Sequence, residues 1–192
     1  MERAAVGFRV KSGWAAVALV DSSTPLPTLL DVRAVQLADP AVPDSTQPYH
    51  AGLDVPNNVG IKTVARLVKI VERFSRRSVV DLLKEYAKSR RLVGVGVVAG
   101  SLVDPATMTN DHIRAHAEEG RLFRVVVVDA AKTLGLMSTV VAEKGLYAEA
   151  STRLRRPVPS LKKDLVALGQ GVDGPWRSEQ KNAALAAWMA LA

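Results

Sequence analysis

The 192-residue chain contains no cysteine and is poor in aromatic residues, with three each of Phe, Trp and Tyr. The absence of cysteine excludes disulfides, thiolate catalysis and cysteine-ligated zinc. No uncharged apolar run approaches the roughly 18 residues that a membrane span requires, and the opening MERAAVGFRV lacks the basic and apolar regions of a secretory signal. We therefore expect a soluble, cytoplasmic protein without a membrane partner.

The basic charge of the chain is concentrated in one segment. The net charge of the whole chain is +7. Between Gly60 and Arg91, ten Lys and Arg residues stand against three acidic residues, a balance of +7, so the rest of the chain is neutral overall. Such an asymmetry is typical of a polyanion-binding surface, and it also occurs on a helix face that only keeps a protein soluble.

The beginning of the sequence has the hydrophobic pattern of strands. We predict strands over residues 5–10, 14–20 and 29–37. The Lys-Ser-Gly that precedes Trp14 suits a tight hairpin turn. The pattern therefore predicts an antiparallel meander, followed over residues 38–59 by a long loop with four prolines.

From Ile61 the hydrophobic period becomes that of a helix, with cations on the opposite face. We predict one helical piece from this point and, after an interruption at residues 75–78, a second piece that ends near Arg91. The cations form a stripe of six residues: Lys62, Arg66, Lys69, Arg73, Arg76 and Arg77. They are our candidate nucleic-acid-binding residues.

The second half of the chain alternates strands with helices. Residues 92–100 have the continuous apolar pattern of a buried strand, and we attribute its glycines to close packing of a helix rather than to a phosphate loop. Residues 124–129 resemble a strand, yet apolar spacings of three and four favour one helix over residues 111–134. We further predict a strand at residues 138–142 and helices at 146–154, 161–168 and 178–192.

This order predicts an α/β fold, a mixed five-stranded sheet with helices on its faces. We expect a domain over residues 1–155 and a helical C-terminal extension over residues 156–192, packed on the same domain. Three segments carry a family pattern: AVGFRVKSGWAAVALV, LVGVGVVAG and EQKNAALAAWMALA. In these segments and in the order of its elements, the chain resembles the ribonuclease H-like superfamily, especially its Holliday-junction-resolvase-like branch.

The resemblance implies several carboxylates around two divalent ions that assist phosphoryl transfer. The first-strand position that it assigns to Asp is Arg9 in this chain, and the fourth strand ends in Gly100 and Ser101 where an acid is implied. Asn182 stands near the implied acid of the closing helix. Because an arginine stays cationic and cannot bind Mg²⁺, we expect degenerate catalytic positions and no cofactor.

Four other acidic residues could form a different site at the carboxyl edge of the sheet. They are Asp104, Asp111, Glu143 and Glu179. A divalent-metal-dependent nuclease or phosphotransferase, using Mg²⁺ or Mn²⁺ on this non-standard set, is therefore an alternative function. Acids at helix starts also complement the helix dipole, which is the structural alternative.

His112 and His116 lie four residues apart and share one face of a helix, the spacing of a metal-ligand pair. A catalytic zinc helix has a glutamate beside its first His, and here that residue is Ile113, so we interpret both as surface histidines. The sequence thus favours a non-nuclease, nucleic-acid-associated module. A homo-oligomeric scaffold that assembles through Leu185, Trp188 and Leu191 of the apolar C-terminal helix is a third alternative.

Overall fold

The protein was analysed as a computed structural model that describes residues 1–22, 26–53 and 55–192. A five-stranded mixed sheet lies at its centre, as predicted, and its strand order is β3-β2-β1-β4-β5. The first three strands form an antiparallel meander, and the last two run parallel to β1. The strands are β1 (Arg3–Lys11), β2 (Trp14–Asp21), β3 (Leu29–Gln36), β4 (Arg91–Ala99) and β5 (Ser138–Ala142).

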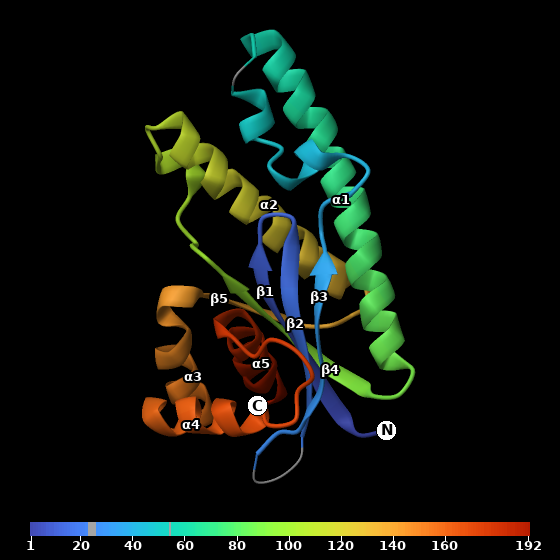
Figure 1. Cartoon of the computed structure of the whole chain (residues 1–192), viewed down its shortest axis with the longest axis vertical. Helices are drawn as coiled ribbons and strands as arrows, with labels where there is room; N and C mark the ends of the chain where they lie inside the picture. The colour runs from blue at the N-terminus through green and yellow to red at the C-terminus, as the bar shows by residue number, and fades with distance from the viewer. Residues whose placement is uncertain (23–25, 54) are drawn as a thin grey trace.

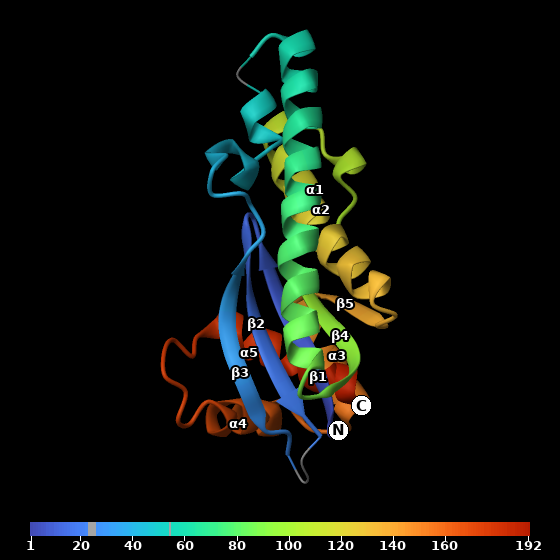
Figure 2. The same ribbon diagram turned by 90° about the vertical axis from the view of Figure 1, so that its right-hand side faces the viewer.

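Helices cover both faces of the sheet (Figure 1). On one face lie α1 (Asn57–Ala87) and α2 (Asp111–Thr133), which pack against each other. On the other face α5 (Ser178–Leu191) contacts β1, β2 and β4 and is itself covered by α3 (Leu146–Leu154) and α4 (Val158–Leu168). The first half of α1 extends past the end of the sheet (Figure 2). No helix of the described ranges is both long enough and apolar enough to cross a membrane.

Alternate residues of the central strands enter two separate cores. Phe8 of β1 and Val97 of β4 are fully buried on the side of α1 and α2. Val98 is buried on the opposite side, in the same cluster as Leu185 of α5. Because successive side chains of a strand point to opposite faces, the position after Phe8 places Arg9 on the α5 side of the sheet.

Glycines in β1 and β4 allow α5 to lie directly on the strands. A Cβ atom built on Gly7 would stand 1.8 Å from the carbonyl oxygen of Ala183, and one built on Gly96 would stand 2.2 Å from that of Ala186. Neither position has room for a side chain. The interpretation of the glycines in residues 92–100 as helix-packing residues is confirmed for Gly96.

The helix α1 is continuous over 31 residues, so the predicted interruption at residues 75–78 was wrong. The break was predicted because Ser78 followed by Asp81 has the form of a capping box, but the buried face of α1 continues through this point with Val71, Ser75 and Val79. Ser75 is fully buried, and its hydroxyl donates a hydrogen bond to the carbonyl of Leu37 just after β3. A serine whose hydroxyl bonds outside its own helix does not compete with the helical hydrogen bonds. The same bond ties the middle of α1 to the edge of the sheet.

The helical interpretation of residues 124–129 is confirmed, because α2 runs through them without a break. Its N-cap is Asn110, whose side chain accepts a backbone hydrogen bond. The helix α4 starts at Val158, three residues earlier than predicted. The helix α5 begins at Ser178, the predicted start, and its N-cap is Arg177, whose backbone amide donates to the side chain of Gln180.

Candidate functional site

The predicted basic stripe lies on the solvent side of α1. We call it the basic helix face, and all six of its residues are exposed: Lys62, Arg66, Lys69, Arg73, Arg76 and Arg77. Within the described part of the chain, the one ion pair of this set joins Arg77 to Asp81 at 3.7 Å. Both partners are largely exposed, so solvent screens their attraction. The basic helix face therefore keeps its positive charge available to an anionic partner.

A surface groove follows the second half of this face. It has a volume of about 580 Å³ and is lined by Lys69, Arg73, Arg76 and Arg77, with Glu72 and Asp81 among its other lining residues. The groove is therefore predominantly basic. Its charge is suited to an extended anionic chain such as a phosphate backbone.

At the carboxyl end of the sheet, β1 brings Arg9 next to the segment that follows β5. The strand register pairs Arg9 with Val98 of β4, and Ala99 with Ala142 of β5. Glu143 therefore begins the short η4 turn (Glu143–Gly145) beside the end of β1. The pairing of three parallel strands, rather than any local motif, brings this arginine and this glutamate together.

Arg9 and Glu143 form a two-pronged ion pair. The Nε atom of Arg9 lies 3.1 Å from Oε1 of Glu143, and Nη2 lies 2.5 Å from Oε2. The third guanidinium nitrogen, Nη1, donates to the carbonyl of Val10. From α5, the side-chain amide of Asn182 donates to Oε1 of Glu143 at 3.0 Å. We call Arg9, Glu143 and Asn182 the strand-end site.

The donor set of the strand-end site does not fit a pair of divalent ions. The Arg9 residue is 2% exposed, and its guanidinium remains cationic in proteins. Both oxygens of Glu143 already accept hydrogen bonds from N–H groups. Hard cations such as Mg²⁺ require several oxygen ligands, and here two of the three side chains are donors. In the strand-end site, Arg9 neutralises the charge of the Glu143 carboxylate.

The four predicted acidic residues are not brought together. Asp104 caps the short η3 turn (Pro105–Thr107), and its side chain accepts from the amide of Ala106 at 3.1 Å. Asp111 pairs with Arg114, three residues further along α2, at 2.5 Å. Among the described residues, no three carboxylates lie close enough to hold one ion. Their separate local contacts agree with the capping role that was the structural alternative.

Glu179, the fourth predicted acid, lies in the first turn of α5. Its carboxylate is 3.6 Å from the ammonium of Lys11 at the end of β1. The pKa of Glu179 is lowered, first by a hydrogen bond from its own backbone amide and then by one from the hydroxyl of Ser178. This carboxylate therefore satisfies its charge within the first turn of the helix.

Apolar side chains of α5 pack against the rest of the molecule. Leu185 is fully buried against the sheet, and Trp188 packs on the same cluster. The guanidinium of Arg156 lies 5.6 Å from the ring of Trp188. Leu185 therefore packs within the chain, whereas Trp188 and Leu191 stay partly exposed, so the scaffold alternative stays a prediction.

A pocket of about 470 Å³ opens at the carboxyl ends of β1 and β4. Arg9 and Ser12 line it from the first hairpin, Ser101 from the segment after β4, and His116 and Gly120 from α2. Ligands of open α/β sheets bind at this edge. Arg9 of the strand-end site and His116 thus line the same pocket.

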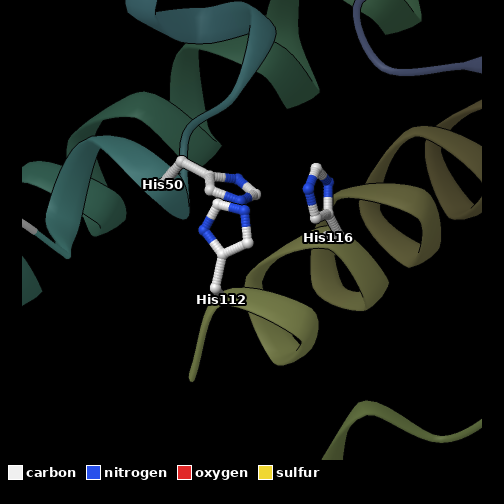
Figure 3. Close-up of side chains that lie close together, drawn as sticks. All are labelled: His50, His112 and His116. Carbon is white, nitrogen blue, oxygen red and sulfur yellow. The ribbon is translucent and has the colours of Figure 1, made fainter. Parts of the chain in front are cut away.

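The three histidines of the chain, His50, His112 and His116, lie close together (Figure 3). His50 lies on the η2 turn (His50–Gly52), whereas the other two lie in the first turns of α2. Their ring centroids are 4.2–4.9 Å apart. The sequence prediction named His112 and His116 and missed His50, which comes from the loop before α1. The sequence offered one hint of its role, which is that His50 is the third of only three histidines in the chain.

Neither a protein-family model nor a curated protein matches this chain. Solved structures do match. The RuvC structure from Thermus thermophilus is 13% identical, with a TM-score of 0.54, and the match covers 97% of this chain and 92% of that one. T. thermophilus RuvC in complex with a Holliday junction substrate is also 13% identical, with a TM-score of 0.56 and coverage of 97% and 91%.

These likenesses establish the fold. The mixed five-stranded sheet and its helices have the ribonuclease H-like architecture of RuvC. The match extends over nearly the whole of both chains, so the helices after β5 belong to the shared architecture. The expected resemblance is confirmed at the level of the fold.

Proposed function

We propose that this ribonuclease H-like chain binds nucleic acid through the basic helix face of α1 and does not use two-metal phosphoryl transfer. The observation that carries the proposal is the single-sided concentration of exposed cations over Lys62–Arg77. Non-specific binding of nucleic acids is driven by cations that displace condensed counterions from phosphates. The structural neighbour in complex with a Holliday junction supports the same class of ligand.

The absence of a nuclease role is supported by the strand-end site. A buried guanidinium repels divalent cations, and Arg9 occupies both oxygens of Glu143. Asn182 contributes an amide donor where a third acceptor would be needed. The strand-end site thus serves the fold, and the nucleic-acid contacts belong to α1.

The contacts are expected to reach phosphates rather than bases. Stacking on bases requires exposed aromatic rings, and the aromatic residues of α1 do not provide them. Phe74 is half-buried, and Tyr86 is buried with its hydroxyl donating to Asp31. Binding should therefore be strongly dependent on salt and weakly dependent on sequence. If about five phosphates are contacted, the logarithm of the association constant falls with the logarithm of salt concentration with a slope of roughly −4 to −5 on duplex.

Fluorescence anisotropy with duplex, four-way-junction and single-stranded probes at stepped salt concentrations tests this function. The variant Lys69→Ala/Arg73→Ala removes two cations of the face and should reduce the magnitude of the slope by about 2. The matched control is Arg153→Ala/Lys163→Ala, which removes two exposed cations from α3 and α4 on the other side of the sheet. Undetectable or salt-independent binding, or an equal loss in the control, would overturn the proposal.

A cleavage assay tests the second half of the proposal. The same probes incubated with Mg²⁺ or Mn²⁺ should remain intact, because no described carboxylate cluster holds these ions. Metal-dependent cleavage that disappears in Glu143→Gln would show that the strand-end site is catalytic after all. Binding and cleavage are measured on one set of probes, so each half of the proposal can fail separately.

A further inference from the structure

The histidine cluster, His50 with His112 and His116, unites two segments that are distant in the sequence. The i, i+4 spacing puts His112 and His116 on one face of α2, and the loop before α1 places His50 against that face. The nearest side-chain nitrogens of the three residues all lie within 4.8 Å of one another. Figure 3 shows the three rings turned toward one shared space between η2 and α2.

A buried carboxylate fixes the orientation of one of these rings. Oε1 of Glu119 is 2.8 Å from Nδ1 of His50 and also accepts the backbone N–H of that residue at 3.2 Å. With Nδ1 donating to the carboxylate, Nε2 of His50 presents its lone pair. That Nε2 atom is buried and has no hydrogen-bond partner. A histidine with a carboxylate behind one nitrogen and a free second nitrogen is the usual arrangement of a metal ligand.

The same carboxylate lacks a positive partner among the described lysines and arginines. Glu119 is fully buried, and its Oε2 atom makes no hydrogen bond and lies 4.0 Å from Nδ1 of His116. Burial of a carboxylate without compensation is costly. A cation held by the neighbouring imidazoles would offset that cost. The arrangement of the three imidazoles and the uncompensated carboxylate of Glu119 are therefore two separate indications of a bound cation.

We propose that His50, His112 and His116 bind one transition-metal ion of the zinc class, with Glu119 orienting His50 from behind. Three imidazoles suit Zn²⁺, Ni²⁺ or Cu²⁺ and do not suit Mg²⁺ or Ca²⁺, which prefer oxygen. Tetrahedral coordination at about 2.0–2.1 Å places ligand nitrogens roughly 3.3 Å apart. His112 and His116 are exposed, so side-chain rotation brings them the remaining distance.

This site differs from the two-metal centre that the family resemblance implies. Its ligands are nitrogens rather than carboxylate oxygens, and they come from η2 and α2 rather than from β1, β4 and α5. Three protein ligands leave a fourth position for water or an oxygen anion. Because His116 also lines the 470 Å³ pocket that contains Arg9, an ion in the cluster lies beside that pocket.

Competition between the full-length protein, without a polyhistidine tag, and a chromophoric zinc chelator tests the site. One equivalent of Zn²⁺ should bind, and His112→Ala and His116→Ala should each weaken its binding at least tenfold. Glu119→Gln should weaken it by about 10–100-fold. The control Asp173→Asn changes an exposed acid in the loop before α5 and should leave the affinity unchanged. Co²⁺ bound at the site should give the intense visible absorption of a tetrahedral ion, and this absorption should be lost in the two histidine variants.

The two histidine variants decide the proposal even if Glu119→Gln fails to fold. Both histidines are exposed, and alanine is a good helix former, so circular dichroism should show an intact fold. No Zn²⁺ binding by the folded natural chain overturns the proposal. So does binding whose affinity is the same in His112→Ala, His116→Ala and the natural chain.

Discussion

The guanidinium of Arg9 on β1 engages both carboxylate oxygens of Glu143, the residue that follows β5. The side chain of Arg9 is 3% exposed and that of Glu143 is 41% exposed, so the pair spans from the interior to the surface. It connects an inner strand to the edge of the sheet through side chains. In the ribonuclease H-like frame, this pair occupies the sheet edge at which open α/β sheets bind their ligands.

Removing the arginine should destabilise the fold. In Arg9→Ala the carboxylate of Glu143 loses its cation and the carbonyl of Val10 loses a donor. Loss of one partner from a fully buried pair costs about 3–5 kcal/mol, and the partial exposure of Glu143 lowers the expected loss to about 2 kcal/mol. Urea unfolding measures it. The control Arg77→Ala removes the exposed i, i+4 partner of Asp81 and should have a much smaller effect, and equal effects would contradict a structural role for Arg9.

Replacing the donors by acids should create a cation site. In the double variant Arg9→Asp/Asn182→Asp, both new carboxylates would face Glu143, and divalent ions take several carboxylate ligands. Mg²⁺ or Mn²⁺ should therefore raise the melting temperature of this variant. Neither ion should raise that of the natural chain or of Arg9→Ala/Asn182→Ala. A comparable rise in the natural chain with Mg²⁺, an ion that the histidine cluster does not suit, would mean that the strand-end site already holds a divalent ion.

Two glycines should respond to alanine in opposite directions. Gly96→Ala forces a Cβ atom into the backbone of α5, 2.2 Å from the carbonyl oxygen of Ala186, and should destabilise the protein by at least about 2 kcal/mol. Gly120 in α2 has no atom within 4 Å of an added Cβ. Gly120→Ala should therefore stabilise the helix by about 0.5–1 kcal/mol. Thermal unfolding compares the two, and a neutral Gly96→Ala would refute direct contact between α5 and β4.

The buried tyrosine of α1 should make stability fall in alkaline solution. Burial, and then the hydrogen bond to Asp31, raise the pKa of the Tyr86 hydroxyl far above its ordinary value. Below about pH 10 the hydroxyl is neutral in both states, and the stabilisation is fully present. Above that pH the unfolded state loses the proton while the folded state keeps it, so the free energy of unfolding declines.

Tyr86→Phe isolates this contribution. The variant should be less stable near neutral pH by about 1–2 kcal/mol, because a buried hydrogen bond is lost. Its free energy of unfolding should fall less between about pH 9 and about pH 11 than that of the natural chain. Tyr147→Phe is the comparison, since burial alone raises the pKa of that half-buried tyrosine. Parallel pH curves for the natural chain and Tyr86→Phe would contradict the assignment.

The strands and most helices were predictable because their signals are local. The apolar run at residues 92–100 and the spacing over residues 111–134 each carry enough information to define an element. The continuity of α1 was not predictable, since Ser78 followed by Asp81 has the local form of a helix start. The helix continues because its buried face, with Val79 and Leu82, packs on the rest of the fold, and that packing is not visible in the local sequence.

The candidate sites divide in the same way. The basic helix face repeats along one helix, so its periodicity alone located it on one surface. The pairing of Arg9 with Glu143 depends on strand order, and no sequence spacing encodes it. His50 was missed for the same reason, because it reaches the histidines of α2 from a proline-rich loop without periodicity. The features that the sequence could not predict are therefore the ones that depend on contacts between elements distant in the sequence.

Because α1 is one unbroken helix, the cations of the basic helix face are held at fixed distances from one another along its axis. From Lys62 to Arg77 the helix rises roughly 22 Å at 1.5 Å per residue. At 3.4 Å per base step, this length corresponds to a footprint of about six or seven base pairs. If the basic helix face binds duplex as proposed, a rigid footprint of this size engages all its phosphates together, so affinity should climb as probes lengthen to that size and then level off.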